Sequence, residues 1–167
     1  MTGRERRLLH EWQAIEKMFP EGGRIKCTPS AFGPSALPVA YEVEYRLKSI
    51  SGIDGEGRPV FGDRFVMDVK LPPEFPSVDA PVEYRFREPR PWHPNIRYAG
   101  PFAGRVCLNQ GDTFQDIAWA IERVGKYLTY EKYHAVNEPP YPEDQIVASW
   151  VVRQGEPEEL IYFEQDD

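Results

Sequence analysis

The spacing of hydrophobic residues predicts that the chain begins with a helix. Residues 4–19 carry apolar side chains at three- and four-residue steps, which is typical of an amphipathic helix. The apolar stripe consists of Leu8, Leu9, Trp12, Ile15, Met18 and Phe19. Pro20, followed by Gly22 and Gly23, predicts the end of this helix.

Four later segments predict strands. A short candidate covers residues 24–28, and the clearest alternation runs from Val39 to Leu47, where every second residue is apolar. Residues 65–71 and 82–86 continue the pattern, and residues 54–57 have the composition of a hairpin-type turn. Consecutive strands that each have one polar face predict a four-stranded antiparallel meander that is covered on one side only.

The last part of the chain predicts two helices. Asp112 and Gln115 have the spacing of a capping box, with Asp112 as the N-cap of a helix that ends near Leu128. Its apolar stripe would cover the inner face of the meander, and consists of Phe114, Ile117, Ala118, Ile121, Val124 and Leu128. A further helix is expected over 143–153. The fold class is therefore α+β: an N-terminal helix, the meander, a proline-rich loop, and two helices packed on one side.

Length and charge limit the function classes. The 167 residues are enough for one domain with its own core, which we assign to 1–154, followed by an acidic C-terminal tail over 155–167. A net charge of -7 argues against nucleic-acid or anionic-membrane binding. We find neither a secretory signal nor an 18-residue apolar run. Two cysteines, at positions 27 and 107, fit a reducing cytoplasm rather than a disulfide framework.

The candidate chemistry lies in the loop between the fourth strand and the next helix. Prolines at 89, 91, 94 and 101 cannot donate hydrogen bonds to a sheet, so this stretch favours a loop. The loop leads to Cys107 and contains Asn95, which has a side-chain amide. A thiol is a good nucleophile and a good leaving group. A neutral amide stabilises an oxyanion without titrating. Together they suggest a covalent acyl-carrier site.

Other interpretations of these residues stay open. A lone cysteine in a cytosolic domain is more often a buried packing residue, as we expect for Cys27. A cysteine hydrolase with His93 or His134 as its base is a second enzyme class, although no signature of such proteases surrounds Cys107. Zinc binding by the cysteines and histidines is disfavoured because no Cys-x-x-Cys or paired-His spacing occurs. We therefore predict no metal and no cofactor.

Several motifs occur in a fixed order along the chain. They are Leu71-Pro-Pro-Glu-Phe-Pro76, Pro81 before the fourth strand, the triplet His93-Pro-Asn95, and Val106-Cys107-Leu108. In this order, and over roughly residues 4–154, the chain resembles the ubiquitin-conjugating enzymes. Its short terminal helices make it similar to the prokaryotic relatives, which occur in operons with a ubiquitin-like protein and an activating enzyme. The same resemblance implies a role in antiviral defence.

The resemblance implies roles for the loop residues. Cys107 would accept the C-terminus of a ubiquitin-like protein as a thioester and pass it to an amine or other nucleophile on a protein target. Asn95 would donate its amide to the oxyanion or hold the active-site loop, and His93 and Pro94 would support that loop. The implied partners are an activating enzyme, a ubiquitin-like protein, a protein substrate and, in some relatives, a ligase.

The resemblance also implies partner surfaces. Phe75 and Pro76 belong to a loop that ligases contact in the family. The first helix, which begins with Arg4, Arg6 and Arg7, would form part of the contact with the activating enzyme. Three arginines in an otherwise acidic protein are also consistent with a docking patch for an acidic partner.

The chain departs from the family pattern at two places. The spacing from Asn95 to Cys107 is longer than in the eukaryotic members, so residues 98–102 look inserted near the thiol. The acidic residue that positions an incoming lysine in many members has no clean match here. Asn137 and Glu138 are the candidates for this role.

Two further points stay open. Glu143 and Asp144, beyond the candidates just named, are possible substitutes for the acidic residue. A non-catalytic binding module with the same fold is the alternative function, although the inactive variants of the family lack the cysteine that this chain retains.

Overall fold

The computed structural model describes residues 1–108 and 116–166, and it begins with helix α1 (Gly3–Met18). Thr2 caps this helix through a reciprocal capping box. The hydroxyl of Thr2 accepts the backbone N–H of Glu5 at 3.1 Å, and the carboxylate of Glu5 accepts the N–H of Thr2 at 3.2 Å. The helix predicted over 4–19 is therefore confirmed, and its first turn is fixed by side chains that the chain itself supplies.

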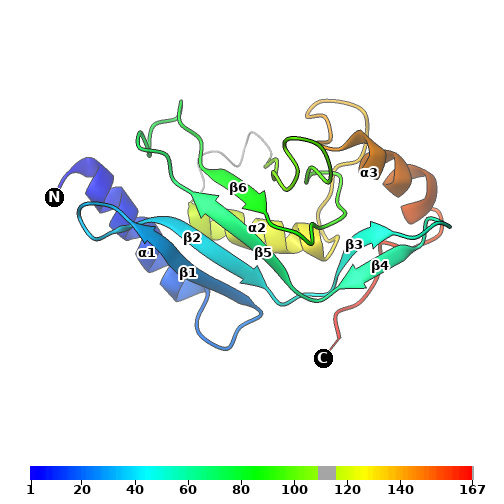
Figure 1. The fold of residues 1–167 in the computed structure, drawn as a ribbon, viewed down its shortest axis with the longest axis horizontal. Coiled ribbons are helices and arrows are strands. Elements are labelled where there is room, and N and C mark those ends of the chain that lie inside the picture. Colours follow the sequence, from blue (N-terminus) through cyan, green and yellow to red (C-terminus); the bar gives the residue numbers. More distant parts are fainter. Residues whose placement is uncertain (109–115, 167) are drawn as a thin grey trace.

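Four strands form an antiparallel sheet in the order β1-β2-β5-β6 (Figure 1). Their bounds are Ile25–Phe32 for β1, Pro38–Tyr45 for β2, Phe65–Lys70 for β5 and Glu83–Phe86 for β6. The predicted four-stranded meander is confirmed. Strand β1 continues past its predicted end at Thr28, with a bulge after Pro29. Because β1 is an edge strand, a proline is tolerated there.

A second, two-stranded sheet lies between β2 and β5 in the sequence. Strand β3 (Ser49–Ile53) pairs with β4 (Pro59–Gly62). The predicted turn joins these two strands, and Asp54 fixes it by accepting the N–H groups of Glu56 and Arg58 at 2.8 and 2.9 Å. The sequence predicts the turn but not the flanking strands.

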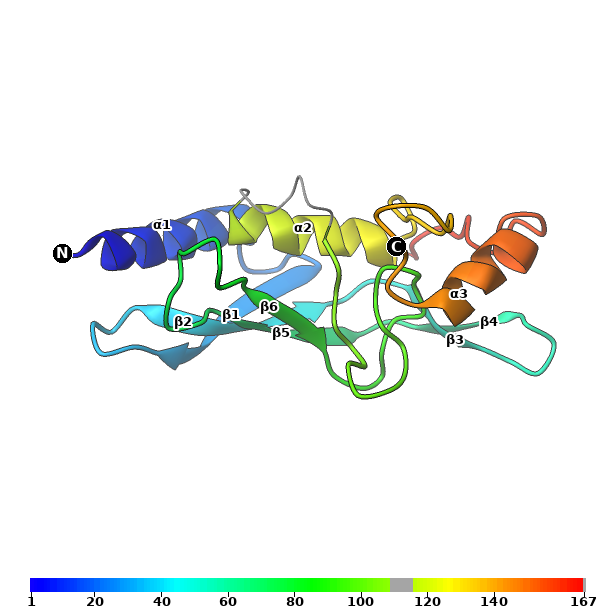
Figure 2. The ribbon, with the colours of Figure 1, turned by 90° about the horizontal axis from the view of Figure 1, so that it is seen from above.

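Helices α1 and α2 (Ile117–Leu128) lie on one face of the four-stranded sheet (Figure 2). Between them and the sheet is the main hydrophobic core, and the hydroxyl of Tyr45 crosses it to donate to the carbonyl of Ile121 at 2.8 Å. Helix α2 is capped by Asp116, whose carboxylate accepts the N–H of Trp119 at 2.8 Å. The predicted capping box of Asp112 and Gln115 lies outside the described residues. No helix in the described part of the chain is long and apolar enough to cross a membrane.

A second hydrophobic cluster lies beyond the first. Helix α3 (Gln145–Trp150) continues into a π-helical turn, η2 (Val151–Gly155), so the helix predicted over 143–153 is present. Its inward side chains pack with Trp92 of the proline-rich loop and with Ile161, which is 1% exposed. The C-terminal segment therefore packs against this cluster. The cluster also contacts the proline-rich loop through Trp92 and so stabilises it.

Candidate active site

Cys107 and Asn95 are neighbours although eleven residues separate them in the sequence. The N–H of Cys107 donates to the backbone carbonyl of Asn95 at 2.9 Å, and Ile96 forms an antiparallel bridge with Val106. Val106 is buried, whereas Cys107 is partly exposed. Residues 96–106 therefore form an excursion of the backbone whose two ends lie side by side. This excursion brings Cys107 next to Asn95, the residue with which the sequence motif pairs it.

Gly104 fixes the return of this excursion against strand β6. Its φ angle is +90°, and a Cβ atom built on it would lie 2.2 Å from the carbonyl oxygen of Phe86. Its own carbonyl accepts the N–H of Phe86 at 2.8 Å, and its N–H donates to Arg97 at 2.6 Å. Both the backbone conformation and the close approach require glycine here.

Gly104→Ala is expected to lower the free energy of unfolding by about 2–4 kcal/mol, because the added methyl group collides with backbone and the φ angle is unfavourable. Gly100→Ala is the matched control, since Gly100 also has a positive φ, +85°, but nothing lies within 4 Å of its built Cβ. The control should lose only about 1–2 kcal/mol. Urea unfolding of the two variants measures the difference, and equal losses would contradict the close approach.

Asn95 is 5% exposed and holds the loop together. Its Oδ1 accepts the backbone N–H of His134 at 2.8 Å, across 39 residues of sequence. Because this bond fixes the carboxamide, the orientation of its NH2 group is also fixed, and that group has no hydrogen-bond partner among the described residues. One side chain thus braces the loop and retains an available donor, and its backbone adjoins that of Cys107.

His93 is a structural residue of the loop. Its Nδ1 accepts the N–H of Asn95 at 3.0 Å, so the proton is on Nε2, which donates to the carbonyl of Lys132 at 2.9 Å. The ring stacks on Tyr127 with a centroid distance of 4.8 Å. Burial lowers the pKa of His93 to about 3. Since both ring nitrogens are hydrogen-bonded, His93 does not fit the role of a general base for a cysteine hydrolase.

The backbone around His93 is tied to the segment before α3. The carbonyl of Pro94 accepts the N–H of Asp144 at 3.0 Å. The carboxylate of Asp144 accepts the N–H of Tyr98 at 3.0 Å and also caps α3 through the N–H groups of Ile146 and Val147. Asp144 is therefore a buried structural acid, and its oxygens are directed at backbone rather than at the thiol.

Two charged side chains, Glu143 and Arg105, lie near the thiol. Oε1 of Glu143 lies 2.6 and 3.0 Å from two nitrogens of Arg105, and 3.9 Å from Nε of Arg97. Burial raises the pKa of Cys107, Glu143 raises it further, and Arg105 opposes them. The surroundings therefore do not activate the thiol in advance, because they favour its protonated form.

Alkylation of Cys107 by iodoacetamide is expected to keep rising with pH above the range of an ordinary cysteine, because a raised pKa leaves less thiolate at neutral pH. Glu143→Gln should move the midpoint down and Arg105→Gln should move it up. Peptide mapping separates Cys107 from Cys27, whose pKa burial raises to about 12. A rate that already levels off below pH 8 would contradict this environment.

The predicted amine-positioning residues lie on the exposed segment after α2. Asn137 and Glu138 are both exposed, and the carboxylate of Glu138 forms no ion pair within 1–108 and 116–166. Their segment is connected to the site through His134, whose ring Nε2 lies 3.1 Å from the carbonyl of Glu138. The structure instead brings Glu143 into contact with Arg105, a charged neighbour of the thiol. Arg105 was not singled out from the sequence.

The predicted partner surfaces lie where α1 meets the loop after β5. The guanidinium of Arg4 donates to the carbonyls of Pro72 and Phe75, and that of Arg7 lies over the ring of Phe75 at 5.5 Å. Both arginines therefore hold the loop that contains Phe75 and Pro76. Arg6 is exposed and donates to the carbonyl of Met1.

A buried carboxylate underlies these arginines. Glu11 is 0% exposed, and its two oxygens accept Nε of Arg7 at 2.6 Å and the N–H of Ile117 at 2.8 Å. The second bond satisfies the first free amide of α2. The sequence places Glu11 among the charges of α1, and only the approach of α2 shows that it is internal. No group of three or more His, Cys, Asp or Glu side chains that would hold a metal ion occurs in the described ranges.

Comparison with known proteins identifies the fold. The sequence matches no family model and no curated protein. Among solved structures, the chain is similar to the E2 domain of a Toxoplasma gondii ubiquitin-conjugating enzyme, with a TM-score of 0.56 and 20% identity. The match covers 92% of this chain and 89% of that chain. The protein therefore has the fold of the ubiquitin-conjugating enzymes, as the sequence predicts.

Proposed function

We propose that the protein accepts the C-terminus of a ubiquitin-like protein as a thioester on Cys107 and transfers it to an amine or other nucleophile on a target protein. The observation that supports this proposal is the pairing of a partly exposed thiol with a buried, braced carboxamide, Asn95, on adjacent backbone. The donor of the acyl group would be an activating enzyme that carries the same ubiquitin-like protein. The prokaryotic and antiviral setting stays a prediction from the sequence.

The chemistry follows from the groups present. The Cys107 thiolate adds to the carbonyl of the incoming thioester, and the NH2 group of Asn95 is available to stabilise the oxyanion. The thiolate of the activating enzyme then leaves, and its proton comes from solvent. In the second step the target nucleophile adds to the new thioester and loses its proton to solvent, and Cys107 leaves as a thiolate. No general base is needed for the exchange between thiols.

The test is a loading assay with the full chain, its activating enzyme, the ubiquitin-like protein and ATP. We expect a covalent adduct that reductant removes and that peptide mapping places on Cys107. Cys27→Ala is the control, because it removes the other cysteine and should leave the adduct unchanged. An adduct that is lost in Cys27→Ala would refute the assignment of the thiol. Tight binding of the ubiquitin-like protein without any adduct would indicate a binding module instead.

A further inference from the structure

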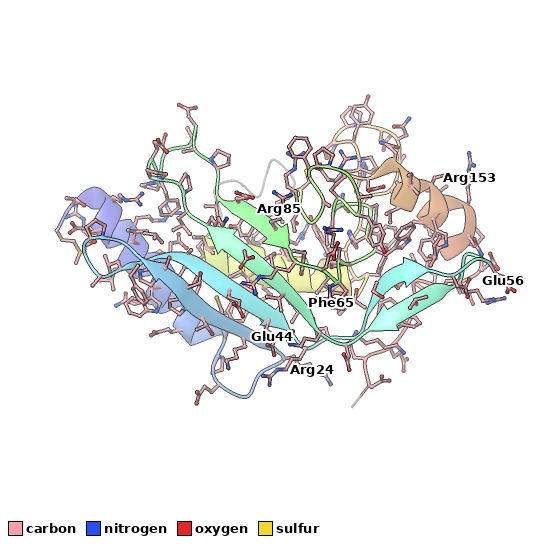
Figure 3. The ribbon with its side chains drawn as sticks, in the orientation of Figure 1. Arg24, Glu44, Glu56, Phe65, Arg85 and Arg153 are labelled. Atoms are coloured by element: carbon pink, nitrogen blue, oxygen red, sulfur yellow. The ribbon has the colours of Figure 1, made fainter. Side chains whose placement is uncertain are left out.

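Three arginines line the approach to Cys107. Arg85 on β6 is the antiparallel bridge partner of Arg105, and the N–H of Arg97 donates to the carbonyl of Arg105 at 2.9 Å. Figure 3 labels Arg85 on this strand. Bridge partners project from the same face of a sheet, and residues two apart on an extended chain share a face. The side chains of Arg85 and Arg105 are therefore neighbours on the same side as Cys107.

The exposed phenyl ring of Phe102 lies among these arginines. The guanidinium of Arg105 lies 4.7 Å from the centre of the ring, and Arg85 donates to the carbonyls of Pro101 and Ala103 on either side of it. Phe102 is 52% exposed. We call Arg85, Arg97, Arg105 and Phe102 the arginine strip. It combines fixed cations with one apolar contact.

The carboxylates near the strip do not neutralise it. Glu143 pairs with Arg105 and lies near Arg97, and Glu83 lies 3.9 Å from Arg85. Asp68, the cross-strand partner of Arg85, pairs with Arg87 instead. Within residues 1–108 and 116–166, the three guanidinium groups thus pair with two carboxylates. The side chains of the three arginines remain 38–46% exposed, so their outer edges are open to a ligand. This surplus of positive charge is local, since the whole chain has a net charge of -7.

The position of the arginine strip suits contact with the carrier protein rather than with the target protein. An extended chain advances about 3.3 Å per residue, so Arg105 and Cys107 lie roughly 7 Å apart along the backbone. A carrier that is joined to the thiol through its last carbonyl and extends toward Arg105 would place the residues two or three positions before that carbonyl level with Arg105. A target nucleophile needs to bring only one group to the carbonyl, and its contacts are not tied to this distance.

We propose that the arginine strip selects a ubiquitin-like protein with an acidic side chain a few residues before its C-terminal carbonyl. This inference rests on the proposed function of Cys107. Exposed cations on a rim attract an anionic segment and repel a cationic one. The carboxylate of the carrier would share Arg97 and Arg105 with Glu143, and Phe102 would contact the neighbouring apolar residue.

Peptide thioesters test this preference without an activating enzyme. The full chain is incubated with N-acetylcysteamine thioesters of acetyl-Asp-Phe-Gly-Gly, acetyl-Asn-Phe-Gly-Gly and acetyl-Lys-Phe-Gly-Gly. In each reaction the Cys107 thiolate forms a bond to the glycine carbonyl and the bond to the cysteamine sulfur breaks. The released thiolate takes up a proton from water, which balances the one that Cys107 has lost. Intact mass and peptide mapping give the initial rate for Cys107.

The aspartate peptide is expected to acylate Cys107 about three- to tenfold faster than the lysine peptide, with the asparagine peptide between them. In Arg105→Glu the ratio should fall to one or invert. Arg24→Glu has the same change in charge and lies at the far end of the sheet from Arg85 (Figure 3), so it should keep the ratio. Because the aspartate and lysine peptides are compared within the same variant, any change in the reactivity of the thiol cancels in the ratio of their rates. In about 1 M salt, where screening acts over about 3 Å, the ratio should also approach one.

The two proposals fail in different ways. Equal rates for the three peptides, a faster lysine peptide, or a ratio that Arg105→Glu leaves unchanged would overturn the acidic preference while Cys107 still accepts acyl groups. A Cys107 that none of the peptides acylates would overturn the proposed function, and this inference with it.

Discussion

Cys107→Ala is expected to abolish the reductant-sensitive adduct completely, while the protein stays folded. Cys107 is only partly buried, and within the described part of the chain its Sγ forms one weak hydrogen bond, to the carbonyl of Leu108 at 3.9 Å. Removing the sulfur therefore takes away the nucleophile but little packing, and the change in unfolding free energy should stay below about 1 kcal/mol. Loading assays and thermal unfolding of the same sample measure the two effects separately.

Cys107→Ser provides the companion result. A hydroxyl at the same position is a weaker nucleophile, so loading should be much slower, and the ester that forms should resist reductant but break down in base. An adduct on Cys107→Ala that matches the wild-type adduct would show that another residue is the acceptor. An unfolded Cys107→Ala would show that the residue belongs to the core.

Asn95→Ala is expected to slow transfer from the thioester by about 100- to 1000-fold, the usual cost of losing one oxyanion donor. The variant also loses the hydrogen bond from the N–H of His134, which should cost about 1–2 kcal/mol of unfolding free energy. Single-turnover transfer to a small amine, measured after loading is complete, separates the rate of this step from binding of the activating enzyme.

Asn95→Asp distinguishes the two roles of the side chain. Aspartate keeps an oxygen for the N–H of His134 but has no NH2 group to donate. If Asn95 stabilises the oxyanion, this variant should be as slow as alanine or slower, because it also adds negative charge. Wild-type rates in Asn95→Asp together with slow transfer in Asn95→Ala would leave bracing as the only role of Asn95.

The parts of the fold that were predicted are those in which one face of an element is buried. The alternation from Val39 to Leu47 and the stripe on residues 4–19 reflect such faces directly. The hairpin of β3 and β4 was missed because its strands are short and only β3 has a fully buried apolar residue, Ile50; in β4, Val60 and Phe61 are 48% and 41% exposed. The order of apolar and polar residues in this hairpin therefore does not follow which residues are buried.

The candidate site was predicted where the chemistry is local in the sequence. His93, Asn95 and Cys107 lie on one loop, so their residue types and order are visible in the chain. The pair of Arg105 with Glu143 depends on the segment before α3 meeting the excursion, across 38 residues. Neither the residue types nor their spacing in the sequence predicts that these two segments come into contact.

The buried carboxylate of Glu11 limits how a partner can use the first helix. Arg7 is its ionic neighbour, so a binding protein that drew this guanidinium to itself would leave an uncompensated charge in the interior, at a cost of about 3–5 kcal/mol. An acidic side chain of a partner could bind Arg6 without this cost, because Arg6 is exposed to solvent. Arg4 and Arg7 thus form internal contacts that stabilise the domain, and Arg6 is the arginine of this helix that remains free to bind a partner.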